Sequence, residues 1–65
     1  MSETLGELAD EIAGIEQRLT DVIYDAVRAQ MHTEDADAAK ELERLLAKVR
    51  RSLVKAEALL RQSQA

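Results

Sequence analysis

The sequence predicts an all-α protein: an antiparallel, coiled-coil-like two-helix hairpin that self-associates into a four-helix bundle. Apolar residues recur at steps of three and four along two long stretches, and the 65 residues include no Pro and only two Gly. This composition is typical of long paired helices. We treat residues 1–65 as one domain. Its helices are expected at about residues 4–31 and 35–62, with a turn at about 32–34.

The first predicted helix carries an uninterrupted apolar stripe. Its steps alternate between three and four residues, which is the repeat of a coiled-coil seam. Thr4 followed by Glu7 matches a capping box, so we expect this helix to begin near Thr4. The stripe consists of Leu5, Leu8, Ile12, Ile15, Leu19, Val22, Ala26 and Ala29.

The second predicted helix repeats the same spacing. Thr33 precedes several acidic residues, so we expect it to be the N-cap. Leu45 and Leu59 lie beside the stripe, as Ile23 does in the first helix, and such widening indicates contact with more than one neighbouring helix. The stripe consists of Ala39, Leu42, Leu46, Val49, Leu53, Ala56 and Leu60.

Charge supports a hairpin in which the two helices lie side by side. Residues 1–31 hold seven acidic and two basic side chains, a net −5, whereas residues 44–65 hold six basic and one acidic side chain, a net +5. Folding back brings the opposite charges together. A short connection also makes the helices antiparallel neighbours.

The chain is too short to stabilise a sizeable core alone, and without Cys it has no disulfide to help. We therefore expect a homodimer that shares one core, with a tetramer as the alternative. The predicted oligomer seam comprises Leu5, Leu8, Ile12, Ile15, Leu19, Val22, Leu42, Leu46, Val49, Leu53 and Leu60.

A second apolar stripe near the end of the first helix is a candidate contact for another protein. Tyr24, Val27 and Met31 recur at helical spacing, and Tyr24 is the only aromatic residue in the chain. An aromatic residue outside a core can anchor a protein partner. Coverage of the bundle edge is the alternative interpretation.

A basic ridge on the second helix is a candidate surface for nucleic acid or an acidic partner. Arg44, Lys48, Arg51 and Lys55 recur at steps of four, three and four, on the side opposite the seam. Such a row can follow a phosphate backbone. A solvated outer face is the competing interpretation, because the whole chain has a net charge of −4 and no aromatic platform for bases.

No residue pattern predicts catalysis, a metal site or a cofactor, so we expect none of them and no enzymatic activity. His32 and the acids after it lack the Gly turn of an EF-hand and a second His one turn away.

Residues 8–23 are similar in apolar rhythm to the first helix of the all-helical chorismate mutases. Ala9 and Ala13 stand where that family has Arg and Asp, which argues against its activity. An enzyme with an intersubunit site ranks last.

The chain also resembles the Rop family of plasmid copy-number regulators in length, in plan and in Asp-Ala-Asp at residues 35–37. These short hairpins dimerise into four-helix bundles and bind paired RNA loops, so the resemblance implies RNA binding through the basic ridge.

Our leading expectation is a small non-enzymatic regulator or adaptor that acts through protein–protein contacts. We expect it to be cytoplasmic, without a membrane segment.

Overall fold

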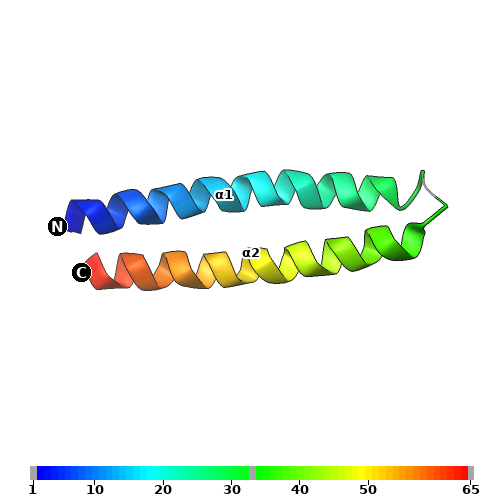
Figure 1. Ribbon diagram of the computed structural model, residues 1–65. Coiled ribbons are helices and arrows are strands. Elements are labelled where there is room, and N and C mark those ends of the chain that lie inside the picture. The colour runs from blue at the N-terminus through cyan, green and yellow to red at the C-terminus, as the bar shows by residue number, and fades with distance from the viewer. Residues whose placement is uncertain (1, 33, 65) are drawn as a thin grey trace.

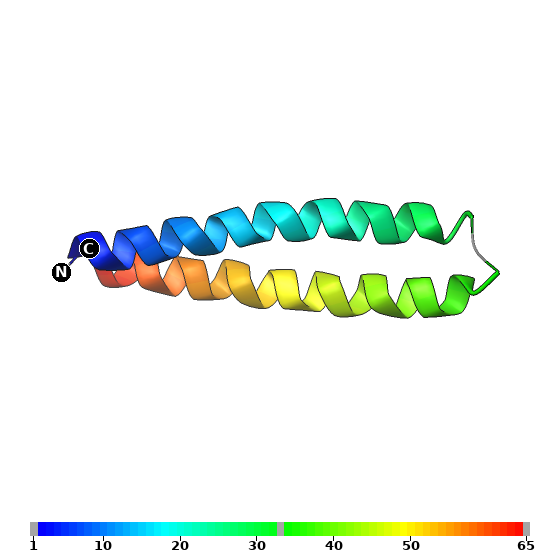
Figure 2. The ribbon, with the colours of Figure 1, turned by 45° about the horizontal axis from the view of Figure 1, so that its top comes forward.

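The fold is a pair of long helices joined by one turn. The computed structural model describes the backbone of residues 2–32 and 34–64, and the side chains of residues 4–32 and 34–63. Helix α1 spans Ser2–Ala29 and helix α2 spans Ala36–Gln64. The helices run antiparallel and side by side along their whole length (Figures 1 and 2). The predicted all-α antiparallel hairpin is confirmed.

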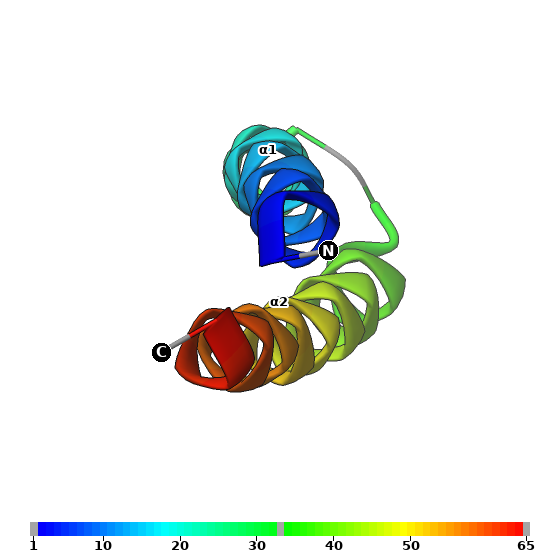
Figure 3. The same ribbon diagram turned by 90° about the vertical axis from the view of Figure 1, so that its left-hand side faces the viewer.

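The hairpin is a thin rod. Its principal extents are 50 × 14 × 10 Å and its radius of gyration is 15.0 Å. A compact chain of this length has a radius of gyration of about 11 Å. Viewed along its length, the rod is a single layer of two helices whose axes are inclined to each other (Figure 3). Few of the described side chains are therefore shielded from solvent.

Helix α1 differs from its predicted bounds at both ends. It begins at Ser2, so Thr4 and Glu7 lie inside the helix and do not cap it. It ends at Ala29 because the next amides turn more tightly: Met31 N–H donates to the Arg28 carbonyl at 3.0 Å, a bond from three residues back. Such i to i−3 bonds close a helix with a 3₁₀ turn.

Helix α2 begins one residue later than predicted and continues to Gln64. The predicted cap, Thr33, lies outside the described residues. Asp35 occupies the capping position: its Oδ1 accepts a hydrogen bond from Ala38 N–H at 3.3 Å, and its carbonyl accepts one from Ala39 N–H at 3.3 Å. A carboxylate that accepts an amide of the first turn satisfies one of the unpaired donors there.

The contact between the helices, here called the hairpin seam, is narrow and partly polar. Among the described residues only Ala9 and Ala26 are buried, with 0% and 6% of their surface exposed. The other seam residues are half-buried. The seam comprises Leu5, Ala9, Ile12, Glu16, Leu19, Ile23, Ala26 and Gln30 on α1, and Ala36, Ala39, Glu43, Leu46, Arg50, Leu53, Glu57 and Leu60 on α2.

Gly14 is a position where the helix can be improved. It is exposed within α1, and an added Cβ would meet nothing within 4 Å. Ala is more favourable than Gly inside a helix by about 0.5–1 kcal/mol. We expect Gly14→Ala to raise the free energy of unfolding by that amount in urea titrations at one fixed protein concentration. The reverse change at exposed Ala58, Ala58→Gly, should lower it similarly, and a destabilised Gly14→Ala would contradict the open surroundings.

Candidate interaction surface

The predicted oligomer seam is divided between two sides of the hairpin. Six of its residues face the other helix and are half-buried: Leu5, Ile12, Leu19, Leu46, Leu53 and Leu60. The other five are exposed: Leu8, Ile15, Val22, Leu42 and Val49. Each of these five follows a hairpin-seam residue by three positions. Along a helix, a step of three residues turns the side chain by about 60° in one direction, and a step of four turns it by about 40° in the other. Each of these five side chains therefore points about 80° away from the midpoint between two seam residues that are four positions apart.

These exposed residues lie on one side of the hairpin. In an antiparallel pair whose helices use equivalent seam positions, equivalent flanking positions fall on the same side. The opposite flank demonstrates this: Thr20 and Ala47, each one residue after a seam leucine, line the same hollow. Leu45 and Leu59 widen the exposed set at its α2 edge. We call this set the apolar side: Leu8, Ile15, Val22, Leu42, Leu45, Val49 and Leu59.

The hairpin exposes more surface than a compact protein of its mass. Its accessible surface is 5111 Å², against about 4,100 Å² for a folded monomer of this mass. The excess is about 1,000 Å² per chain. Single exposed apolar residues are common on proteins, but a continuous apolar side of a few hundred Å² marks a contact surface.

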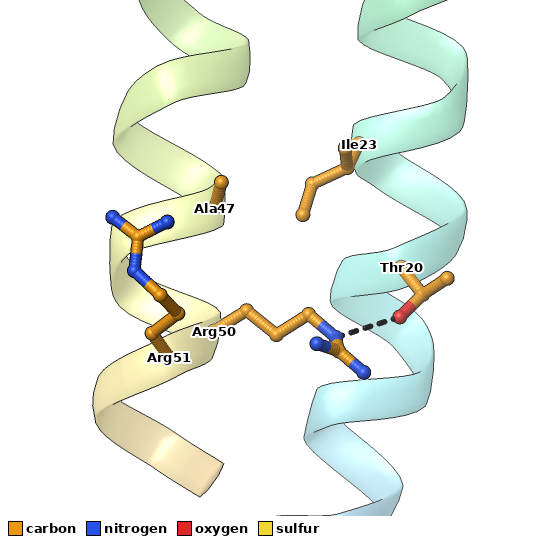
Figure 4. Close-up of a pocket in the computed structure, with 5 residues that line it drawn as sticks. All are labelled: Thr20, Ile23, Ala47, Arg50 and Arg51. Atoms are coloured by element: carbon orange, nitrogen blue, oxygen red, sulfur yellow. Dashed lines mark hydrogen bonds between the residues drawn. The ribbon is translucent and has the colours of Figure 1, made fainter. Parts of the chain in front are cut away.

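The other side of the hairpin holds a shallow hollow of about 310 Å³ (Figure 4). Arg50 reaches across from α2, and its Nε donates a 2.9 Å hydrogen bond to Thr20 Oγ1. The Thr20 hydroxyl itself donates to the Glu16 carbonyl at 3.0 Å. Ile23 and Ala47 line the hollow between the helices, and Arg51 lies on its α2 side. Sequence reasoning missed Arg50, although it lies four residues after Leu46, at a seam position.

An ion-pair cluster joins the basic end of α2 to the acidic start of α1, as the charge distribution predicts. Arg61 Nη2 lies 3.0 Å from Asp10 Oδ1 on the other helix, and Arg61 Nε lies 2.7 Å from Glu57 Oε2 one turn earlier. Farther along the seam, Gln30 Nε2 donates to Glu43 Oε1 at 2.5 Å. These exposed and half-exposed contacts fix the register more than they stabilise the fold.

Two carboxyl groups face each other next to this cluster. The pKa of Glu16 is raised, first by its hydrogen bond with Glu57, then by partial burial and by repulsion from that residue. The pKa of Glu57 is lowered by the same bond and by its bond to Arg61. Glu16 Oε2 is shielded from solvent, and no donor among the described residues reaches it. One proton shared by the two carboxyls accounts for all three observations.

The predicted partner stripe does not join the apolar side. Tyr24 is exposed on the outer side of α1, with the Arg28 guanidinium 6.0 Å from its ring centroid. Val27 follows buried Ala26 by one residue and therefore lies on the side of the hollow. Met31 lies beyond the end of α1 and is 78% exposed. A role of these three residues in binding stays a prediction.

The predicted basic ridge is solvent-facing along α2. Arg44, Lys48, Arg51 and Lys55 are all exposed. Arg44 Nη1 lies 3.5 Å from Glu41 Oε1 on its own helix. The cationic groups of the other three form no ion pair with any side chain that the structure describes. The ridge thus presents its cationic groups to solvent.

Chemical sites of other kinds do not emerge from this geometry. Within residues 4–32 and 34–63, no three His, Asp or Glu side chains gather where a metal ion could be held. Neither described helix combines the length and apolar character that crossing a bilayer requires. Comparisons with protein-family models, curated proteins and solved structures find no match for this chain.

The carboxyl pair predicts a pH dependence of stability. Because the pKa of Glu16 is raised, its stabilising contribution is present at acidic pH and is lost as pH rises through that pKa. Because the pKa of Glu57 is lowered, its contribution is present above its ordinary pKa and is lost as pH falls through the lowered value. Stability from this pair is therefore greatest between the two values.

Glu16→Gln should remove the loss on the alkaline side, because the amide is uncharged and can donate to Glu57 at any pH. Thermal melts from about pH 4 to about pH 8 would measure this as a flatter profile. Glu7→Gln, at an exposed position away from the pair, serves as the matched control. A wild-type decline retained in Glu16→Gln would contradict the shared proton.

Proposed function

We propose that this protein is a non-enzymatic helical-bundle protein that self-associates through its apolar side and acts as a regulator or adaptor by protein–protein contacts. The observation that carries the proposal is the apolar side itself. Seven exposed aliphatic residues gather there on two helices, while the hairpin buries only two alanines among its described residues. Because so small a core leaves most of the aliphatic surface in contact with water, burying that surface would stabilise the protein further.

A second copy of the chain fits this surface. The whole rod exposes about 1,000 Å² more surface than a compact chain of its mass, and a standard protein interface buries about 800 Å² per partner, so pairing along one side would bring the exposed surface near that of a compact protein. A two-fold interface sets the same surface of each copy against the other, and a surface without charged members meets its own copy without like-charge repulsion. Two hairpins give four helices around one core, which is the architecture of a four-helix bundle. A tetramer is the alternative.

A non-enzymatic role agrees with the shape of the other side. The hollow beside Thr20 is open to solvent, and the Thr20 hydroxyl donates to a backbone carbonyl. A nucleophile needs a base within hydrogen-bond reach to remove its proton, and Arg50 is a donor to Thr20. We therefore assign the molecule to binding chemistry.

Two valines on α2 provide a matched test of self-association. Val49 belongs to the apolar side and is 40% exposed, whereas Val54 follows a seam leucine by one residue, lies on the side of the hollow and is 41% exposed. Val49→Glu would place an unpaired carboxylate in the interface, at a cost of about 2 kcal/mol or more, or about 30-fold in the dimer dissociation constant.

Sedimentation equilibrium over a dilution series would measure this constant. We expect a wild-type dimer, a weakened or monomeric Val49→Glu variant, and a Val54→Glu variant that associates like the wild type. A wild-type chain that stays a folded monomer at every concentration, with a melting temperature independent of concentration, would overturn the proposal. Equal effects of both substitutions would remove the apolar side as the interface.

RNA binding by the basic ridge is the second candidate function. The observation that favours it is the set of three exposed cations, Lys48, Arg51 and Lys55, that have no acidic partner among the described residues. Like charges three and four residues apart on a helix repel each other, and a polyanion would relieve this repulsion.

This candidate predicts salt-dependent binding of structured RNA. Changing Arg44, Lys48, Arg51 and Lys55 to Gln should abolish retention of paired RNA loops at low salt, because each lost phosphate contact reduces the counterion release that drives binding. Fluorescence anisotropy with labelled RNA over a salt series would measure affinity and salt slope. No binding by the wild type at low salt would eliminate the candidate and leave the adaptor proposal unaffected.

A further inference from the structure

We propose that two copies of the chain pair with their turns at the same end of the bundle, so that the acidic α1 of each copy lies against the basic α2 of the other. This inference rests on the proposed self-association through the apolar side. It adds which helices meet in the interface and in which direction they run. Both depend on where the hairpin places its charges beside the apolar side.

Two-fold symmetry offers two face-to-face arrangements of such hairpins. An axis parallel to the helices keeps their directions, brings the two turns together, and sets each α1 against the partner's α2. An axis perpendicular to the helices, in the plane of the interface, puts the turns at opposite ends. In that arrangement α1 packs on the partner's α1 and α2 packs on the partner's α2.

The net charges of the helices favour the first arrangement. Helix α1 has seven acidic and two basic side chains, a net −5, and α2 has seven basic and four acidic side chains, a net +3. With the turns together, every neighbouring pair of helices in the bundle is one acidic and one basic helix. With the turns apart, each α1, with its net charge of −5, packs against the partner's α1, and each α2, with its net charge of +3, packs against the partner's α2. Juxtaposed like charges disfavour an association, and opposite charges favour it.

The register of the hairpin makes this comparison specific. Contacts of Asp10 with Arg61 and of Thr20 with Arg50 set the heights at which the two helices face each other. With the turns together, the partner's α2 stands at these same heights, because the symmetry axis is parallel to the helices. Lys48 of the partner then lies level with the stretch between Asp21 and Asp25, two exposed acids. Asp25, three residues after Val22, lies on the edge of the apolar side, and Asp21 lies one turn earlier on the outer face of α1.

Not every charge on this edge follows the trend. With the turns together, Arg18 lies near the height of Lys55 of the partner, a pair of like charges. With the turns apart and the helices fully overlapped, Arg18 would instead lie near Glu11 of the partner. Asp25 would then lie near Glu7 of the partner, however, and the ridges of the two α2 helices would share one side. The net charges of the helices that meet therefore favour the arrangement with the turns at the same end.

Distance measurement between two spin labels tests the arrangement directly. The chain has no Cys, so one introduced Cys carries the only label. His32 lies in the turn and is exposed, which makes His32→Cys a reporter for the position of the turns. With the turns together, pulsed electron–electron double resonance should give a separation of about 20–30 Å, two to three helix spacings. With the turns apart, the separation approaches the 50 Å length of the rod.

A label at Gln17, near the middle of α1 and exposed, is the matched control because it gives a short separation in either arrangement. Short separations at both positions support the inference. A short separation at Gln17→Cys with a long one at His32→Cys would overturn the inference and leave the self-association standing. No dipolar coupling at either position would overturn the self-association, and the arrangement with it.

Discussion

The narrowness of the contact between two helices is the constraint on which the rest of this structure depends. Two helices can cover only one strip of each other, and here that strip closes over Ala9 and Ala26. These small residues let the backbones approach, but they bury little apolar area. The larger aliphatic residues are left at the margins of the strip or beside it. The apolar side is thus a direct geometric consequence of folding this sequence as a hairpin.

The same narrowness explains why polar groups are tolerated in the seam. Glu16, Arg50 and Glu57 occupy seam positions and are half-buried there, which long side chains allow because their methylene groups can cover apolar surface while their polar ends reach a partner. The charged ends then find partners across or along the hairpin: Thr20 for Arg50, and Arg61 for Glu57. A seam built this way selects one register through hydrogen bonds, while most of the large exposed aliphatic residues lie on the apolar side.

The two helices and their antiparallel course could be predicted because the three-and-four spacing and the charge asymmetry extend over the whole chain. Helix ends were less predictable. Thr4 and Glu7 have the residue types of a capping box, but the helix continues past them, and the cap of α2 is formed by Asp35. Local side-chain chemistry allowed several ends, and only the complete path of the backbone distinguishes them.

The division of the apolar stripe could not be predicted from spacing. A run such as Leu8, Ile12, Ile15 and Leu19 fits one broad stripe equally well whether it contacts one neighbour or two. The spacing of apolar residues also gives no weight to Glu16 or Glu57, so it does not predict the carboxyl pair. Its signal was present nonetheless: Ala9, Glu16, Ile23 and Gln30 recur every seven residues, which is the interval of a second seam position.

The neighbouring positions of the first and last helical turns have a topological consequence. Ser2 and Gln64 belong to the same extremity of the rod, opposite the turn (Figure 1). Any domain or tag fused beyond either residue would therefore project from one pole. In a bundle with both turns at the other pole, four such attachment points would cluster together. Fused binding modules would then be presented as a multivalent group, with a local concentration set by the bundle and not by their abundance.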